Sequence, residues 1–258
     1  MENNQPNSRA QIQGRAASGK LSRGWPVAIV FARLALAICA QALIALLFFR
    51  SHASGFIEAG QWWPVYAILI DLGCFVFVTW QAGREGLRFR DLVNFDSRRL
   101  GRDLLIGLAY ILWVFPLAMA GIIGFSLLIF GTAQPPSVYS PLPGWAAVYS
   151  LIVFPVIWGL MEQCTYQGYC LPRLEVLLGG RGFAVILVAF GWGIQHIALP
   201  MTFDLRFMAF RFLSFIPLAV AMTLVYLRTR RLVPFVVAHW AVDMLGILTG
   251  VVLPMLAR

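Results

Sequence analysis

The sequence is poor in charge, and this shortage excludes most classes of soluble protein. Only 12% of its 258 residues are Asp, Glu, Lys or Arg, whereas 60% are hydrophobic. A soluble domain typically carries about 25% charged and about 45–50% apolar residues. The apolar residues form runs of about 18–25, the length that crosses roughly 30 Å of hydrocarbon as a helix. The composition therefore predicts an all-α integral membrane protein.

The sequence also has few residues that bind metals or form disulfides. It contains three histidines and four cysteines, and the cysteines lie in or beside apolar segments without the paired spacing of a zinc site. It lacks the HExxH pattern of the usual zinc metalloprotease helix. We therefore expect the cysteines to be buried free thiols.

The formal net charge of +9 suggests a nucleic-acid partner at first sight. The basic residues nevertheless sit in short segments between apolar runs, which is the pattern that orients membrane proteins, so we expect no nucleic-acid partner. Most of the 20 Lys and Arg residues fall in four segments that alternate along the chain: 1–25, 81–103, 173–181 and 228–231. This bias predicts seven crossings, a cytoplasmic N-terminus and an external C-terminus.

The chain is predicted to fold as a polytopic transmembrane bundle. Residues 1–25 are expected to be a disordered cytoplasmic tail. Residues 26–144 are expected to form N-terminal transmembrane helices with a basic cytoplasmic loop at 81–103, and residues 145–258 a C-terminal core. The seven expected spans cover residues 26–49, 62–80, 104–130, 145–172, 182–200, 207–227 and 232–254.

Ionisable side chains inside a membrane cost roughly 2.5–3.5 kcal/mol each on insertion scales, and they mark functional sites. Four candidates belong to the expected spans 4, 5 and 7, namely Glu162, His196, His239 and Asp243. Counted from the nearest cytoplasmic basic residues at about 1.5 Å per residue, all four fall in one layer near the middle of the bilayer. Helices running in both directions bring them to this depth, which predicts a polar site between the three spans.

Helical spacing groups the polar residues of these spans by face. His239 and Asp243 are four residues apart and share one face of span 7. The same spacing joins Trp192 to His196, Glu162 to Tyr166, and Gln163 to Gln167. Such side chains must face protein or a water-filled cavity. Away from this group, we expect a structural partner for Asp71 on span 2, and we expect Arg211 on span 6 to extend its guanidinium outward.

A carboxylate with two histidines in a membrane cavity allows three kinds of chemistry. In peptide-bond hydrolysis, a buried Glu162 accepts a proton from water while span 7 stabilises the oxyanion. In metal catalysis, Glu162, His196 and His239 are alternative zinc ligands around an activated water. In proton-coupled transport, acids and histidines form a relay, although the sequence shows no internal repeat of the kind common in transporters.

At these residues the sequence resembles the CPBP family of intramembrane proteases. That family includes the type II CAAX prenyl endopeptidases and Abi-like relatives linked to bacteriocin processing or self-immunity. Its three motifs are Glu-Glu-x-x-x-Arg, aromatic-x-x-x-His, and His-x-x-x-Asn or a related polar residue. They correspond here to residues 162–167, 192–196 and 239–243. The resemblance covers about residues 155–250 and implies that 145–258 is a CAAX-protease-like catalytic core.

The resemblance implies a role for each site residue. Glu162 is the base that activates water, His196 helps hold that water, and His239 and Asp243 lie on the oxyanion side. Gln163, Gln167, Tyr166 and Trp192 support them. No cofactor is expected, with zinc as the alternative.

The sequence departs from the family motifs at three positions. Gln163 and Gln167 replace the second Glu and the Arg as a neutral pair, which avoids a buried unpaired charge. Asp243 stands in place of Asn, so it must be protonated to donate a hydrogen bond to an oxyanion, whereas the ionised form would orient His239.

The resemblance implies an intramembrane endopeptidase with a peptide or protein substrate, embedded in the lipid bilayer of a bacterial plasma membrane. Two alternatives remain. The first is a catalytically degenerate relative that acts as a membrane binding or immunity factor, and the second is a proton-coupled transporter.

Overall fold

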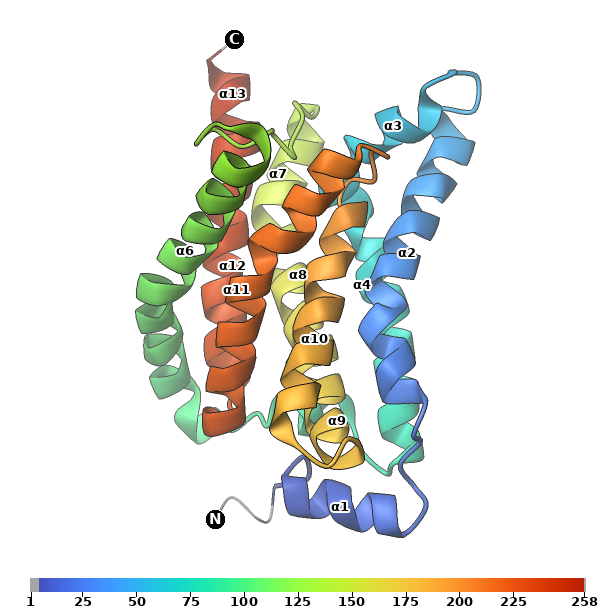
Figure 1. Cartoon of the computed structure of the whole chain (residues 1–258), viewed down its shortest axis with the longest axis vertical. Coiled ribbons are helices and arrows are strands. Elements are labelled where there is room, and N and C mark those ends of the chain that lie inside the picture. The colour runs from blue at the N-terminus through green and yellow to red at the C-terminus, as the bar shows by residue number, and fades with distance from the viewer. Residues whose placement is uncertain (1–4, 258) are drawn as a thin grey trace.

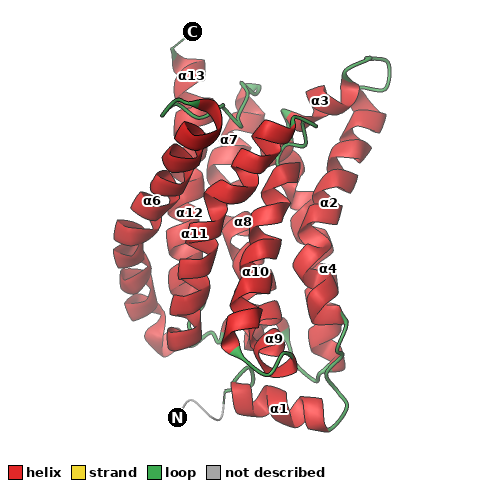
Figure 2. Ribbon diagram, viewed as in Figure 1, coloured by secondary structure: helices red, strands yellow, loops and turns green. Residues whose placement is uncertain are grey.

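The structure, a computed structural model of the chain, describes residues 5–257. Every regular element in that range is helical (Figure 2). The elements are α1 (Arg9–Ala17), α2 (Trp25–Phe48), α3 (Gly55–Gly60), α4 (Trp63–Arg84), α5 (Phe89–Val93), η2 (Ser97–Arg99), α6 (Leu100–Phe130), α7 (Gly144–Ile152), α8 (Phe154–Gln163), η3 (Cys164–Cys170), α9 (Leu171–Leu177), α10 (Arg181–Gln195), η4 (His196–Ala198), α11 (Leu205–Thr229), α12 (Val233–Ile247), η5 (Leu248–Val252) and α13 (Leu253–Leu256).

The long helices run roughly parallel to one another and form one bundle (Figure 1). Among the described residues, six helical segments are long and apolar enough to cross a membrane, and the number is seven when α7 and α8–α9, bent by 41° at their junction, are counted as one span. The expected polytopic all-α fold is therefore confirmed. Consecutive spans alternate in direction, so the segments expected to be cytoplasmic all lie at the end of the bundle that α1 covers (Figure 1).

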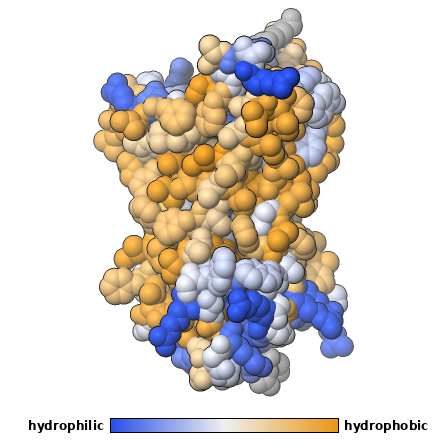
Figure 3. Space-filling model, turned by 90° about the vertical axis from the view of Figure 1, so that its right-hand side faces the viewer, coloured by the Kyte–Doolittle hydropathy of each residue, from blue (hydrophilic) through white to orange (hydrophobic). Residues whose placement is uncertain are grey.

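The surface of the bundle carries the apolar belt that a bilayer requires. Large aliphatic side chains on the outer faces of the helices are exposed; Leu112 and Leu128 on α6, for example, have 80% and 78% of their surface accessible. Figure 3 shows this hydrophobic belt between two ends where hydrophilic residues gather. An apolar surface of this extent is characteristic of a lipid-facing protein. The chain is an integral, multi-pass membrane protein.

Local sequence signals set several helix ends. Proline lies in the first turn of α2, α4, α8 and α12, where its missing N–H leaves no hydrogen bond unmade. Asp204 caps α11, because its carboxylate accepts hydrogen bonds from the backbone N–H groups of Arg206 and Phe207. Helix α6 ends at Gly131, whose φ of 74° is left-handed.

The predicted disorder of residues 1–25 is wrong for residues 5–25, and residues 1–4 lie outside the described part of the chain. Helix α1 lies across the end of the bundle (Figure 1), and its Ile12 is fully buried. Just before α1, the Asn7 amide donates to the carbonyl of Gly168 at 2.7 Å and accepts from Arg173 at 3.0 Å. These buried contacts with distant residues order the segment despite its polar composition.

All four cysteines are free, as expected, but only Cys74, Cys164 and Cys170 are buried. Cys39 is exposed on the surface of the bundle, contrary to the prediction.

Span 4 is not one continuous α-helix. After α8 it passes through a π-helix, η3, before it resumes as α9. This wide turn begins two residues after Glu162, and π-helical turns occur frequently at functional sites.

Candidate active site

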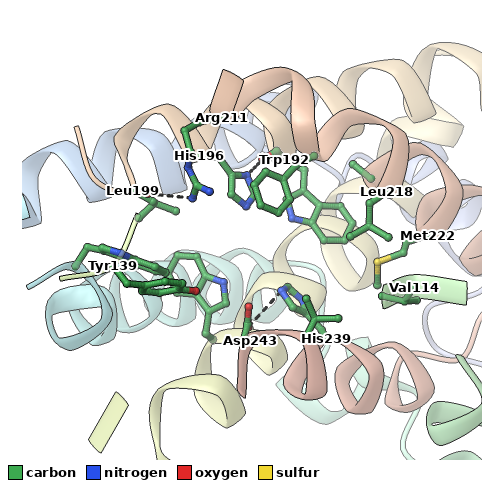
Figure 4. A pocket seen from close by; sticks show the side chains of 15 residues that line it. Val114, Tyr139, Trp192, His196, Leu199, Arg211, Leu218, Met222, His239 and Asp243 are labelled. Carbon is green, nitrogen blue, oxygen red and sulfur yellow. Dashed lines mark hydrogen bonds and ion pairs between the residues drawn. The ribbon is translucent and has the colours of Figure 1, made fainter. Parts of the chain in front are cut away.

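A cavity of about 70 Å³ lies inside the bundle between α10, α11 and α12. Since one water needs roughly 10–15 Å³ measured in this way, the cavity can hold several water-sized groups. His239 and Asp243 point into it from α12, and His196 and Arg211 approach from the opposite wall (Figure 4). Trp192 also lines it. The cavity therefore contains both predicted histidines and the predicted aspartate.

His239 connects the polar groups of spans 4 and 7. The side-chain amide of Gln163 lies 2.9 Å from Nδ1 of His239. An amide N–H donates there, so the ring proton belongs on Nε2. Nε2 lies 3.1 Å from Oε2 of Glu162 and 3.4 Å from Oδ2 of Asp243. The structure thus brings Glu162, His239 and Asp243 together, with Gln163 fixing the imidazole from behind.

The two carboxylate oxygens of Glu162 differ in their hydrogen-bond partners. Its side chain is fully buried, and Oε1 accepts a hydrogen bond from the amide of Gln195 on α10. Oε2 has no aligned hydrogen-bond partner within the described residues and faces the imidazole of His239. A buried carboxylate oxygen in this state is the natural acceptor for a water proton.

Gln195 is in turn held by a buried arginine that comes from the first span. Nε of Arg33 on α2 donates to Oε1 of Gln195 at 2.8 Å, and its Nη1 donates to Asp71 on α4 at 2.9 Å. The guanidinium also lies over the ring of Trp158, 4.1 Å from the centroid. Asp71 therefore has the structural partner that we expected. A continuous chain of contacts links it through Arg33 and Gln195 to Glu162.

His196 faces the same cavity without contacting Glu162 directly. Its Nδ1 lies 2.8 Å from the carbonyl of Trp192, and since a carbonyl only accepts, Nδ1 carries the proton. The ring stacks on Phe215 with 3.8 Å between centroids. These two contacts fix the ring and leave Nε2 as the acceptor nitrogen.

The two supporting residues on the π-helix, Tyr166 and Gln167, differ in the contacts that they make. Gln167 does not pair with Gln163, because both polar atoms of its buried amide lack a hydrogen-bond partner. The Tyr166 hydroxyl donates to the carbonyl of Gly191, and its ring stacks on Trp192. The extra residue in each π turn rotates this segment out of the i, i+4 register. Tyr166 and Trp192 therefore pack α10 against span 4.

Arg211 is also placed differently from the prediction. Only 6% of its surface is exposed, and its guanidinium turns inward to the cavity wall (Figure 4). There it donates to the carbonyl of Leu199 at 3.0 Å and lies 5.1 Å from the centroid of Phe215. These two contacts hold the guanidinium at the cavity wall, so the side chain does not extend outward.

The alternative zinc ligands do not form a metal site. Within residues 5–257, no three His, Cys, Asp or Glu side chains are arranged to hold a metal ion. Nε2 of His239 is already directed to two carboxylates, and Oε1 of Glu162 is occupied by Gln195. We therefore derive no step through zinc.

The sequence reasoning missed Arg33 and Gln195. A signal for Arg33 was available, because it is an isolated charge within the apolar span 26–49, and charges inside spans mark functional positions. Gln195 directly precedes His196 but carries no charge. Its importance depends on the partners that α2 and α8 bring to it, and these are not visible in a local motif.

The comparison with protein families addresses the same region. Residues 143–245 match the family model described as "Type II CAAX prenyl endopeptidase Rce1-like". The chain carries an Rce1-like domain. The resemblance to the CPBP family is thus confirmed, and the domain holds Glu162, His196, His239 and Asp243. Comparison with curated proteins and with solved structures gives no match.

The Rce1-like domain does not contain the whole candidate site. It covers spans 4, 5 and 6 and most of span 7, whereas Arg33 and Asp71 belong to the helices that precede it. The family that this domain matches is described as an endopeptidase family. The N-terminal helices complete the polar network around the candidate base.

Proposed function

We propose that this protein is an intramembrane endopeptidase in which Glu162 activates a water molecule for attack on a peptide bond. The observation that carries the proposal is the convergence of three side chains: Nε2 of His239 lies 3.1 Å from Glu162 and 3.4 Å from Asp243. His239 and Asp243 line the cavity inside the bundle, and Glu162 is buried directly behind His239. The Rce1-like domain supports protease activity in general. The geometry supports the particular roles.

In the first step, a water bound beside His239 donates hydrogen bonds to Oε2 of Glu162 and to Nε2 of His196. The water oxygen attacks the substrate carbonyl carbon as Glu162 takes the proton. The carbonyl π electrons move to its oxygen, and the Nε2–H group of His239 donates to the resulting oxyanion. Gln163 orients His239 for this role through Nδ1, and Asp243, which lies 3.4 Å from the same Nε2, donates a second hydrogen bond to the oxyanion in its protonated form.

In the second step, the tetrahedral intermediate collapses. The carbon–nitrogen bond breaks, and protonated Glu162 returns its proton to the leaving amine, so the free carboxylate is restored. Gln195, held by Arg33, keeps Oε1 occupied and thereby presents Oε2 to the water. Gln163 takes the position of the second family Glu by fixing Nδ1 of His239, so this route remains complete without that acid.

We also propose an orientation in the membrane. The end covered by α1 faces the cytoplasm, because the arginines of segments 81–103 and 228–231 gather there. Seven crossings then place the C-terminus outside. The substrate is a peptide or protein segment that enters the cavity from within the bilayer.

Purified protein in liposomes tests the catalytic proposal. The substrate probe is a library of apolar peptides that carry a fluorophore and a quencher. Glu162→Gln should reduce turnover by at least about 10³-fold, because it removes the proton acceptor while it retains size and hydrogen bonding. Glu58→Gln is the matched control, because it makes the same chemical change on α3, away from the cavity. A hydrogen bond from Ser54 lowers the pKa of the Glu58 carboxyl. Unchanged turnover in Glu162→Gln would remove Glu162 from the mechanism.

A further inference from the structure

Among the described residues that line the cavity, Arg211 is the one charged side chain that the proposed reaction does not use. It lies on α11, and only 6% of its surface is exposed. One terminal nitrogen donates to the carbonyl of Leu199, while Nε is buried without a hydrogen-bond partner. A guanidinium offers five N–H donors, so the protein satisfies this one only in part.

The charge of Arg211 also lacks a counter-ion. Across the described part of the chain, no Asp or Glu oxygen lies within 4.0 Å of its guanidinium. The fully buried arginines Arg33 and Arg173 both have an acid as partner, Asp71 at 2.9 Å and Glu85 at 2.8 Å. An unpaired cation inside a membrane protein is costly, and such cations are commonly found beside anions that they bind.

The position of Arg211 identifies where that anion would lie. Arg211 and His196 form one wall of the cavity, and His239 and Asp243 form the other (Figure 4). Asp243 is the one acid among the described residues that line the cavity, and it is turned to His239 at 3.4 Å. An anionic group bound beside Arg211 would therefore lie next to the reacting bond and within the same cavity.

We propose that Arg211 is a specificity residue that binds a carboxylate of the peptide substrate close to the scissile bond. This inference rests on the proposed function, and it adds the chemical class of the substrate. Arg suits a carboxylate because its planar N–H groups match the two oxygens. The carboxylate has two sources in a peptide, the free C-terminus and an acidic side chain.

Four versions of one short apolar peptide separate these sources. The first ends in a free carboxylate and the second in an amide. The third and fourth end in amides and carry Glu or Gln near the C-terminus. Binding is measured to Glu162→Gln protein in nanodiscs, where no cleavage occurs, and turnover is measured with the wild-type protein in liposomes.

The protein should bind at least one carboxylate peptide about tenfold or more tightly than its neutral counterpart, as expected for hydrogen bonds to a charged group. Wild-type turnover should show the same preference in KM, with kcat changed less. Arg211→Gln should abolish the preference and Arg211→Lys should retain part of it. Arg206→Gln, on the exposed start of the same helix, should leave it intact.

The outcomes distinguish this inference from the proposed function. Equal binding of both members of each pair, or a preference that survives Arg211→Gln, would overturn the role of Arg211 whether or not the peptides are cleaved. A carboxylate preference that depends on Arg211 without any cleavage by the wild-type protein would support the binding site and contradict the protease.

Discussion

Arg33 is the residue through which the N-terminal helices reach the candidate base. Its Nε donates to Gln195, which donates to Glu162, and its Nη1 is held by Asp71. The side chain is fully buried. We therefore propose that Arg33 is a positioning residue, which fixes the direction of the Gln195 amide without contacting the substrate.

A paired substitution separates this role from simple stability. Arg33→Met alone should destabilise the protein by about 3–5 kcal/mol, because Asp71 is left buried without its partner. Adding Asp71→Leu should restore most of the thermal stability measured in detergent, since both charges are then gone. Turnover of the double variant should stay about 10²-fold below wild type, because Gln195 no longer holds Glu162 in place. A stable double variant with wild-type turnover would show that Arg33 is only structural.

The three residues that converge in the candidate site could be predicted, because each lies in a span where charge is expensive and at a depth that can be counted. Glu162, His239 and Asp243 converge as that count indicates. Arg211 could not be placed in this way. Whether an arginine near a span end turns outward or inward depends on the cavity that other helices enclose, and hydropathy along one span does not contain this information.

At the scale of elements, the main departure from prediction is the π-helix η3. An i, i+4 rule pairs Gln167 with Gln163, but no hydrogen bond joins them, and the turn widens from Cys164 onward. Local sequence gives little sign of a π-helix, which depends on packing around it. The boundaries of the spans were predicted better, since they follow from the length of apolar runs.

The close packing of α6 on α11 can be tested by substituting glycine. Helices α6 and α11 approach so closely at Gly121 that an added Cβ would collide with the backbone carbonyl of Ser214. Gly121→Ala should therefore destabilise the bundle by about 1–3 kcal/mol, measured as a lower unfolding temperature. Gly124→Ala on the same helix meets no atom within 4 Å and should be neutral or slightly stabilising. Equal effects of the two substitutions would contradict the packing of α6 on α11.

At the scale of the whole molecule, the six to seven apolar spans could be predicted from hydropathy. The order of the N-terminal segment could not be predicted in this way. Polar composition alone indicates a tail, and only the buried contacts of Asn7 with Gly168 and Arg173 reveal that the segment covers one end of the bundle. These partners lie more than 160 residues away in sequence.

The proposed orientation predicts the behaviour of reporter fusions at the C-terminus. Seven crossings from a cytoplasmic N-terminus should make a C-terminal alkaline phosphatase active and a C-terminal green fluorescent protein dark, because each folds on only one side of the membrane. The same reporters fused after residue 230, at the arginine-rich turn before α12, should give the reverse result. Fluorescence at the C-terminus would contradict the orientation or the number of crossings.

The central claim is that the carboxylate on α8 and the imidazole on α12 work as one hydrolytic unit. A double-mutant cycle measures this directly, with peptide turnover determined for Glu162→Gln, His239→Gln and the variant that carries both. We predict that the double variant is about as slow as the slower single variant, because groups that act together lose their effect once either is removed. Losses that multiply in the double variant would contradict the account, since the two residues would then contribute independently.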